Sequence, residues 1–220
     1  MSFEVRLVDI SCQFGTSILF ENLTMTIPSG GVQFITGKSG SGKSTLLETI
    51  AGIIPVQKGS LFWDGHDIHN SGRVVMTNLE FRSAVVFQQH ALISYLPLFE
   101  NIALPLRHHK RGTKSEIDEI VHSLVQRLQL DRVAWNLPET LSEGQRKLGA
   151  IARALSINPE FLCMDEPMHG LDIEQRQLLF KLFDELVIQK DKTIVIATDD
   201  QELLSRCDFP IHDQNSKVYK

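Results

Sequence analysis

The stretch GKSGSGKST, residues 37–45, combines glycines, hydroxyl side chains and a lysine in a spacing that suits phosphate binding. It fits the pattern G-x-x-x-x-G-K-[ST] and ends with Lys43 and Ser44. Glycines let backbone N–H groups turn inward around phosphate oxygens, and a helix beginning here adds partial positive charge. We expect Lys43 to reach the outer phosphates and the Ser44 hydroxyl to bind Mg²⁺. The expected contacts are Gly37, Lys38, Ser39, Gly40, Ser41, Gly42, Lys43, Ser44 and Thr45.

A second stretch, FLCMDEP at 161–167, places two carboxylates directly after an apolar run. Asp165 ends the run, so its carboxylate should emerge at the edge of a sheet, where it suits Mg²⁺ through water. Glu166 follows at once and could polarise a water for attack on a terminal phosphate. Alone this pattern is weak, but together with 37–45 it predicts a nucleoside triphosphatase. The chain has no N-K-x-D motif for guanine, so ATP is favoured over GTP.

The elements that must hold these residues follow from hydrophobic periodicity. Residues 4–10 and 23–27 alternate as strands do, and residues 60–65 suggest a strand entering an Asp-Gly turn. Short apolar runs predict buried strands at 32–36, 84–87, 161–165 and 193–198. Helical spacing predicts helices at 114–130, 142–157 and 172–189. The predicted caps are Thr113 with Glu116, Ser142 with Gln145, and Asp172.

Apolar strands that alternate with helices indicate an α/β fold, a P-loop NTPase core with a mostly parallel sheet covered on both faces. The first 35 residues predict strands. The mainly helical stretch 88–150 looks like an insertion, with residues 1–87 and 151–220 as the nucleotide-binding core. A length of 220 residues suits one such domain, 1–220. Residues 88–106 are rich in apolar side chains for a loop region.

Composition excludes several classes of protein. The net charge of −5 argues against a general nucleic-acid binder. The three cysteines, Cys12, Cys163 and Cys207, lie far apart and form no C-x-x-C pair, which favours buried thiols in a reducing compartment. No stretch approaches about 18 apolar residues, and the N-terminus lacks a signal-peptide core. We therefore expect a cytoplasmic protein that a partner holds at the membrane if it works there.

The stretch LSEGQRKLGAIARAL, residues 141–155, resembles the L-S-G-G-Q signature of ABC-type ATPases and the helix that follows it. Other landmarks of that family occur in the same order. Gln88 in VVFQQ stands at the Q-loop, EPMHGLD at 166–172 resembles the Walker B end and D-loop, and Phe14 stands where an aromatic stacks on adenine. The resemblance covers nearly the whole chain, and it implies a core with an antiparallel β lobe at the N-terminus and an inserted helical lobe near 88–150.

The resemblance implies a head-to-tail dimer, a homodimer or a heterodimer with another ABC ATPase, which closes on ATP and opens after hydrolysis. Glu166 would be the general base, and Gln88 would contact Mg²⁺ and water beside Ser44 and Asp165. Asp172 would be the D-loop acid. The signature residues Ser142, Glu143, Gly144 and Gln145 would contact the ATP of the opposite chain.

Two positions depart from the family's pattern. Glu143 replaces a glycine of the signature, and we expect its carboxylate to point away from the phosphate. Asp199 replaces the switch histidine that donates to the γ-phosphate and helps hold the attacking water. An ionised aspartate only accepts hydrogen bonds, so slow hydrolysis, an outward or protonated Asp199, or a heterodimer with one intact site remain open. His169 stands in the D-loop, at the implied dimer interface.

The resemblance favours a subunit that powers a membrane transporter through an integral membrane permease, peripheral on the inner face of the cell membrane. Residues 98–107 weakly resemble the group that moves lipids or lipoproteins. One alternative is an ABC-type ATPase that signals or scaffolds at a membrane complex without transport. Another is a soluble protein acting on nucleic acid or cofactor assembly, although relatives of that kind carry a long coiled-coil insertion or two cassettes.

Overall fold

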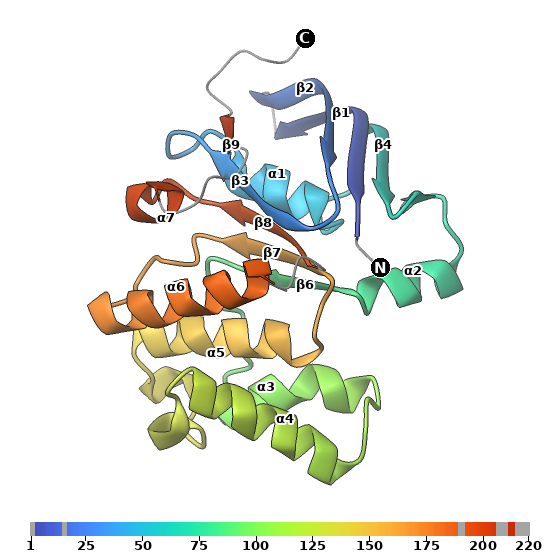
Figure 1. The fold of residues 1–220 in the computed structure, drawn as a ribbon. Helices are drawn as coiled ribbons and strands as arrows, with labels where there is room; N and C mark the ends of the chain where they lie inside the picture. The colour runs from blue at the N-terminus through green and yellow to red at the C-terminus, as the bar shows by residue number, and fades with distance from the viewer. Residues whose placement is uncertain (1–2, 15–16, 189–191, 206–210, 214–220) are drawn as a thin grey trace.

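The computed structural model describes residues 3–14, 17–188, 192–205 and 211–213. It contains an antiparallel sheet, a parallel sheet and helices on either side of the parallel sheet (Figure 1). The strands are β1 (Val5–Phe14), β2 (Ser17–Ile27), β3 (Gly31–Thr36), β4 (Lys58–Trp63), β5 (His66–Asp67), β6 (Ser83–Val86), β7 (Phe161–Asp165), β8 (Thr193–Ala197) and β9 (Ile211–Asp213). The helices are α1 (Lys43–Ile50), α2 (Arg73–Glu80), α3 (Leu98–His108), α4 (Lys114–Arg127), α5 (Glu143–Ser156), α6 (Ile173–Ile188) and α7 (Gln201–Ser205). These elements confirm the predicted α/β class.

The parallel sheet has the strand order β6-β7-β8-β3-β9, and its central strands are buried on both faces. Alternate residues of β8 serve different cores: Ile194 and Ile196 pack with α3, α4, α5 and α6, whereas Val195 and Ala197 pack with α1 and the antiparallel sheet. This arrangement explains why the buried strands read as continuous apolar runs. It also brings the carboxyl ends of β3, β7 and β8 to one edge.

The antiparallel sheet, β2-β1-β4-β5, lies above α1 in Figure 1. Strands β4 and β5 form a hairpin in which Trp63 pairs with His66. Asp64 and Gly65 both have positive φ, 50° and 80°. A two-residue turn with positive φ at both positions favours Asp-Gly, so the predicted turn is confirmed.

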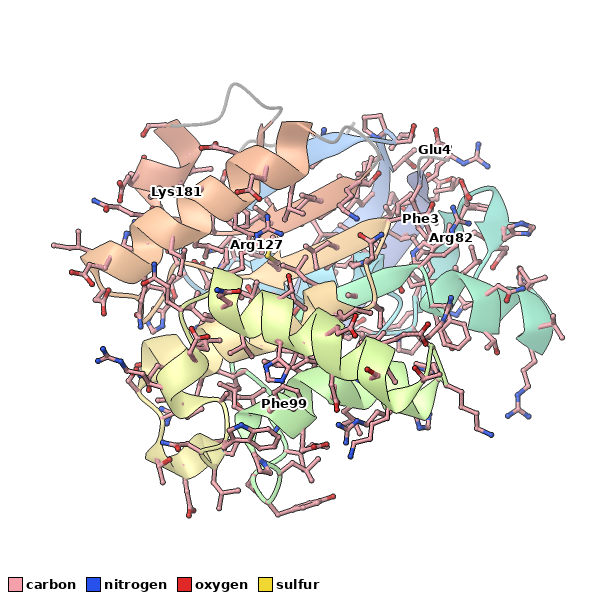
Figure 2. The ribbon with its side chains drawn as sticks, turned by 60° about the horizontal axis from the view of Figure 1, so that its bottom comes forward. Phe3, Glu4, Arg82, Phe99, Arg127 and Lys181 are labelled. Atoms are coloured by element: carbon pink, nitrogen blue, oxygen red, sulfur yellow. The ribbon has the colours of Figure 1, made fainter. Side chains whose placement is uncertain are left out.

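Helices α3, α4 and α5 pack together below the parallel sheet (Figure 1). The prediction that 88–106 is a loop region is wrong from Leu98 onward, where α3 begins after Pro97. Its apolar side chains face α5 so closely that a Cβ on Gly149 would clash with Leu98. In Figure 2 the labelled Phe99 lies among these helices, and its ring stacks on Trp135 at 4.6 Å.

Helix α2 was not predicted. It is short and buries only Leu79 fully, while Val75 and Met76 pack partly buried against the same core. The predicted capping boxes of α4 and α5 are both present. Helix α5 runs without interruption across residue 150, where the predicted helical insertion ends. The insertion is therefore continuous with the core through this helix. Among the described residues, no helix is long and apolar enough to cross a membrane.

Candidate nucleotide site

Strand β3 and helix α1 hold the phosphate loop between them. β3 ends at Thr36, and α1 begins at Lys43 with Gly42 at the N-cap. Gly42 has φ of 92°, which side chains with a Cβ rarely adopt, so the helix can start this abruptly because the residue is glycine. The first turn of the helix leaves backbone N–H groups available to an anion.

Lys43 is folded over this loop rather than extended into solvent. The residue is 7% exposed, and its Nζ donates to the carbonyl oxygen of Gly37 at 2.8 Å. The same Nζ lies 3.9 Å from Oδ2 of Asp199. The ammonium is therefore held at the loop and already faces one carboxylate.

A cavity of about 650 Å³ opens above the loop. It is lined by Leu19, Ser39, Gly40, Gly42, Lys43, Ser44, Thr45, Gln88, Glu166, His169 and Asp199. Lys43 is the sole lysine or arginine in this lining, as far as the described residues go. The loop, Walker B and Q-loop residues predicted from widely separated motifs thus meet in one place.

Several predicted nucleotide contacts do not line the cavity themselves. Lys38 is exposed, and its carbonyl accepts from the N–H of Ser41 at 3.0 Å, which closes the turn of the loop. For Phe14 the backbone is described as the end of β1, but its side chain lies outside the described residues. Leu19 on β2 lines the cavity and was not predicted from the sequence.

Asp165 ends β7 and is 6% exposed. Burial raises the pKa of its carboxyl group, against a hydrogen bond from Ser44 and the charges of Lys147 and Lys43, which lower it. Its Oδ1 is buried without a hydrogen-bond partner in the described chain. A buried carboxylate oxygen without a partner is costly unless a cation satisfies it. The Ser44 hydroxyl beside it completes a donor set that fits Mg²⁺.

Mg²⁺ prefers oxygen ligands and usually keeps several waters, so it does not need a cage of protein side chains. Within the described ranges no group of three or more histidine, cysteine, aspartate or glutamate side chains could hold a metal ion. This matches a site in which Asp165 and Ser44 share the ion with phosphate oxygens and water.

Glu166 stands between the cavity and the end of β8. Its Oε2 accepts a hydrogen bond from the Thr198 hydroxyl at 3.0 Å, and its N–H donates to the Ala197 carbonyl at 2.9 Å. Burial is the main cause that raises the pKa of Glu166, and the nearby carboxylates of Asp199 and Asp165 raise it further. A raised pKa makes this carboxylate a stronger base than an exposed glutamate.

The two aspartates after β8 have different surroundings. Asp199 is exposed, lines the cavity and faces Lys43. Asp200 instead accepts from Nη2 of Arg176 at 2.9 and 2.8 Å and from the N–H of Leu203 at 2.9 Å. Asp200 therefore joins α6 to α7, and Asp199 alone belongs to the site.

Gln88 is tied to helix α5 through its carbonyl oxygen. That oxygen accepts from Nζ of Lys147 at 3.1 Å, and Nδ1 of His90 lies 3.0 Å from it. Lys147 is fully buried, and burial lowers its pKa. Sequence reasoning missed this contact, since a lysine at a helix start is usually solvated. The contact links the Q-loop to the signature helix.

The signature lies at the N-terminus of α5, outside the lining of the phosphate cavity. The Ser142 hydroxyl accepts from the N–H of Gln145 at 3.2 Å, and the Gln145 side chain accepts from the N–H of Ser142. Gly144 is packed so tightly against Gln175 that a Cβ would clash. Gln175 in turn accepts from the N–H of Asp172 at 3.1 Å. The signature and the D-loop are therefore fastened together within this chain.

Asp172 caps α6, as predicted, since its Oδ1 accepts from the N–H of Gln175 at 2.9 Å. The Glu143 carboxylate lies against the D-loop, with Oε1 3.3 Å from Nδ1 of His169. Of the three cysteines, Cys12 and Cys163 are buried and unpaired, and Cys207 lies outside the described residues.

Comparison with known proteins agrees with this geometry. A family model described as ABC transporter matches residues 20–169. The chain is 34% identical over 198 residues to the probable ribonucleotide transport ATP-binding protein mkl of Mycobacterium leprae, covering 90% of this chain and 57% of the relative. It is 38% identical over 205 residues to the sulfate/thiosulfate import ATP-binding protein CysA of Pectobacterium atrosepticum, covering 92% and 60%. The chain thus spans a little over half the length of these relatives.

Two solved structures of MJ0796 share the fold over most of both chains. A dimeric structure of this bacterial ABC transporter cassette gives a TM-score of 0.86 at 28% identity, covering 96% of this chain and 94% of that chain. A dimeric post-hydrolysis state bound to ADP and Pi gives 0.82 at 30% identity, covering 90% and 89%. The chain therefore belongs to the ABC transporter family and has the fold of a single ATP-binding cassette.

Proposed function

We propose that this chain powers a membrane transporter by closing as a dimer on ATP and opening after hydrolysis. The observation that carries the proposal is the cavity that gathers Lys43, Ser44, Gln88 and Glu166 beside the partnerless oxygen of Asp165. These groups supply the phosphate cradle, the metal ligands and the base that ATP hydrolysis requires.

In the proposed mechanism, bound Mg²⁺ supplies charge neutralisation at the β- and γ-phosphates. Lys43 holds the outer phosphate oxygens, and the N–H groups of the loop and of the first turn of α1 bind the others. Glu166 accepts the proton of the attacking water, helped by the raised pKa of its carboxyl group. Gln88 lines the same cavity, where its side chain would contact the attacking water and the bound metal ion.

The signature would act on the ATP of a second chain. The 14-residue helix α5 begins with a capping serine, and the N-terminus of a helix carries a partial positive charge that suits an anion. Because the signature lies outside its own chain's phosphate cavity, it remains available to the ATP of a partner. The MJ0796 structures are dimers, which supports this arrangement.

Asp199 makes nucleotide entry less favourable than in a site with histidine there. In the absence of nucleotide its carboxylate lies 3.9 Å from the Lys43 ammonium, and an arriving triphosphate must compete for that ammonium while meeting a like charge. The same observation supports a second candidate function, an ABC cassette with weak turnover that signals or scaffolds at a membrane complex.

The proposed partner is an integral membrane permease, which would hold the chain at the inner face of the cell membrane. The surface formed by the segment before α3 and by the turn after α4 exposes two large aromatic side chains, Tyr95 and Trp135. They are 77% and 61% exposed, and although Trp135 also stacks on Phe99, each leaves apolar surface that such a partner would cover. The relatives' names concern ribonucleotide and sulfate transport and lend no support to a lipid substrate.

Purification of the full chain from its native membrane, followed by ATPase assays with candidate substrates, tests this proposal. A transporter subunit should co-purify with a polytopic membrane protein and hydrolyse ATP faster when the transported compound is added. Co-purification with a membrane protein without any stimulation would favour the scaffold. Recovery with soluble partners alone would contradict both functions.

A further inference from the structure

The cavity holds an imidazole that the family pattern does not require. His169 lines the cavity together with Glu166 and Asp199, and it is the sole histidine among the described lining residues. Its side chain is 63% exposed, so a small molecule in the cavity can reach it. Asp199 stands at the position of the switch histidine and cannot donate a hydrogen bond when ionised.

The carboxylate of Glu143 lies against that imidazole. Its Oε1 is 3.3 Å from Nδ1 of His169. Because a carboxylate only accepts hydrogen bonds, this contact favours the tautomer with the proton on Nδ1, which leaves the lone pair of Nε2 for another group. In the described part of the chain, Nε2 has no hydrogen-bond partner. Carboxylates orient histidines in this way in many catalytic sites.

The backbone is adapted to this pair. Gly170 has φ of +78°, and a Cβ there would stand 2.7 Å from the carboxyl carbon of Glu143. A larger residue at 170 would therefore displace the Glu143 carboxylate from the D-loop. The glutamate that departs from the signature and the glycine beside the histidine fit each other.

A turn brings His169 close to the proposed base. The N–H of His169 donates to the carbonyl of Glu166 at 3.2 Å, so the two residues are the first and last of a four-residue turn. The Cα atoms at such positions are less than about 7 Å apart. Both side chains line the same cavity, which allows one water molecule to contact both.

We propose that His169 is a further catalytic residue and Glu143 its positioning residue. The attacking water donates one hydrogen bond to Glu166 and the other to Nε2 of His169. Its oxygen bonds to the γ-phosphorus while the bond from that phosphorus to the β–γ bridging oxygen breaks, and ADP departs. Glu166 takes the proton, and His169 keeps its own on Nδ1. His169 thus holds the water in place of the group that Asp199 has replaced.

This inference rests on ATP hydrolysis with Glu166 as base and not on transport, so the test begins with the parental full chain and Lys43→Ala. If the parental chain hydrolyses ATP and Lys43→Ala does not, the hydrolysis site is established independently of the result for His169. His169→Ala should then lower kcat about tenfold, less than the roughly 10²–10⁴-fold contribution of a general acid or base, because His169 holds the water without taking its proton. The Kd for ATP should change by less than about threefold. His108→Ala, an exposed histidine on α3, should keep the parental kcat.

A double-mutant cycle separates water-holding from loop support. If His169 and a histidine at 199 hold the same water, Asp199→His should raise kcat several-fold more in the His169→Ala background than in the parental chain. Glu143→Gly should lower kcat less than His169→Ala, since the imidazole remains but is no longer oriented. A parental kcat in His169→Ala, a loss of ATP binding in it, or additive effects in the cycle would overturn the proposal.

Discussion

At the scale of single residues, charge around the Lys43 ammonium decides how the site behaves. Three carboxylates surround this part of the cavity: Asp165, Glu166 and Asp199. Asp165 and Glu166 are buried enough for their pKa values to be raised, and Asp199 is exposed and faces the ammonium. In the proposed function, a triphosphate would enter this acidic site together with Mg²⁺, and the ion and Lys43 would offset the charge.

Replacing Asp199 should therefore strengthen nucleotide binding. Asp199→Asn keeps the shape and removes the charge, so the Kd for ATP measured by calorimetry should fall by roughly threefold, in line with about 0.2–1 kcal/mol for an exposed ion pair. The gain should shrink at high salt. Asp200→Asn, one residue on, should leave the Kd unchanged because Asp200 binds Arg176 instead. A higher Kd for Asp199→Asn than for the parental chain would show that the carboxylate helps to hold Lys43 in place.

Asp199→His goes further, because it also supplies a donor to the γ-phosphate. We expect it to raise the ATPase rate of the assembled complex by a few-fold. Steady-state hydrolysis with the membrane partner present measures this effect. An equal or lower rate would mean that the site has adapted around the acid.

At the scale of elements, the sequence predicts what short-range chemistry determines. The phosphate loop, the capping boxes and the Asp-Gly turn each depend on residues within a few positions of one another. Helices α2 and α3 were missed for physical reasons. Helix α2 has only eight residues and no side-chain cap, and α3 begins after Pro97 and contains Pro105, a residue that usually ends a helix. Both helices bury apolar side chains on one face, but the usual start and stop signals are missing.

The site's long-range contacts were not predictable from a single sequence. Lys43 meets Asp199 across 156 positions, and Lys147 meets Gln88 across 59 positions. Only the fold brings these groups together. The departures at Glu143 and Asp199 were visible in the sequence, but the contact between Glu143 and His169 was not.

One ion-pair cluster joins elements that are distant in sequence. Arg82 donates through Nε and Nη2 to Glu160 at 2.9 and 2.7 Å, and through Nη1 to Asp64 at 2.9 Å. Its guanidinium lies 5.1 Å from the centre of the Phe3 ring, next to which Figure 2 shows it. The hydrogen bond from Arg82 is the main cause that lowers the pKa of Glu160. The cluster fastens the start of β6 to the start of β7.

Glu160→Gln should therefore lower the free energy of unfolding at pH 7 by about 1 kcal/mol. A carboxyl group with a lowered pKa in the folded state stabilises above its unfolded pKa of about 4.3. That contribution disappears as the pH falls through the folded value, so parental and variant stabilities should converge below about pH 4. Urea titrations across this range measure the effect, with exposed Glu139→Gln as the control. A difference independent of pH would contradict the ionic origin.

At the scale of the whole molecule, the proposal implies that one chain holds only part of a working site. The cavity is lined by the phosphate loop and by Glu166, the proposed base, whereas the chain's own signature lies outside that lining and is fastened to the D-loop. Binding of ATP between two copies, or between this chain and another cassette, would complete it. This explains how hydrolysis can be converted into opening and closing of an assembly.

The most direct test of ATP-driven dimer closure compares the parental chain, Glu166→Gln and Lys43→Ala in the presence of ATP and Mg²⁺. Sedimentation velocity measures the dimer, and an ATPase assay measures hydrolysis. Glu166→Gln should bind ATP, sediment as a stable dimer and lose hydrolysis, because the base is absent while the charge that joins the two chains remains. Lys43→Ala should stay monomeric and inactive. Hydrolysis by Glu166→Gln at the parental rate would contradict the assignment of the base. A monomeric Glu166→Gln saturated with ATP, whether alone or mixed with its native cassette partner, would contradict ATP-driven closure.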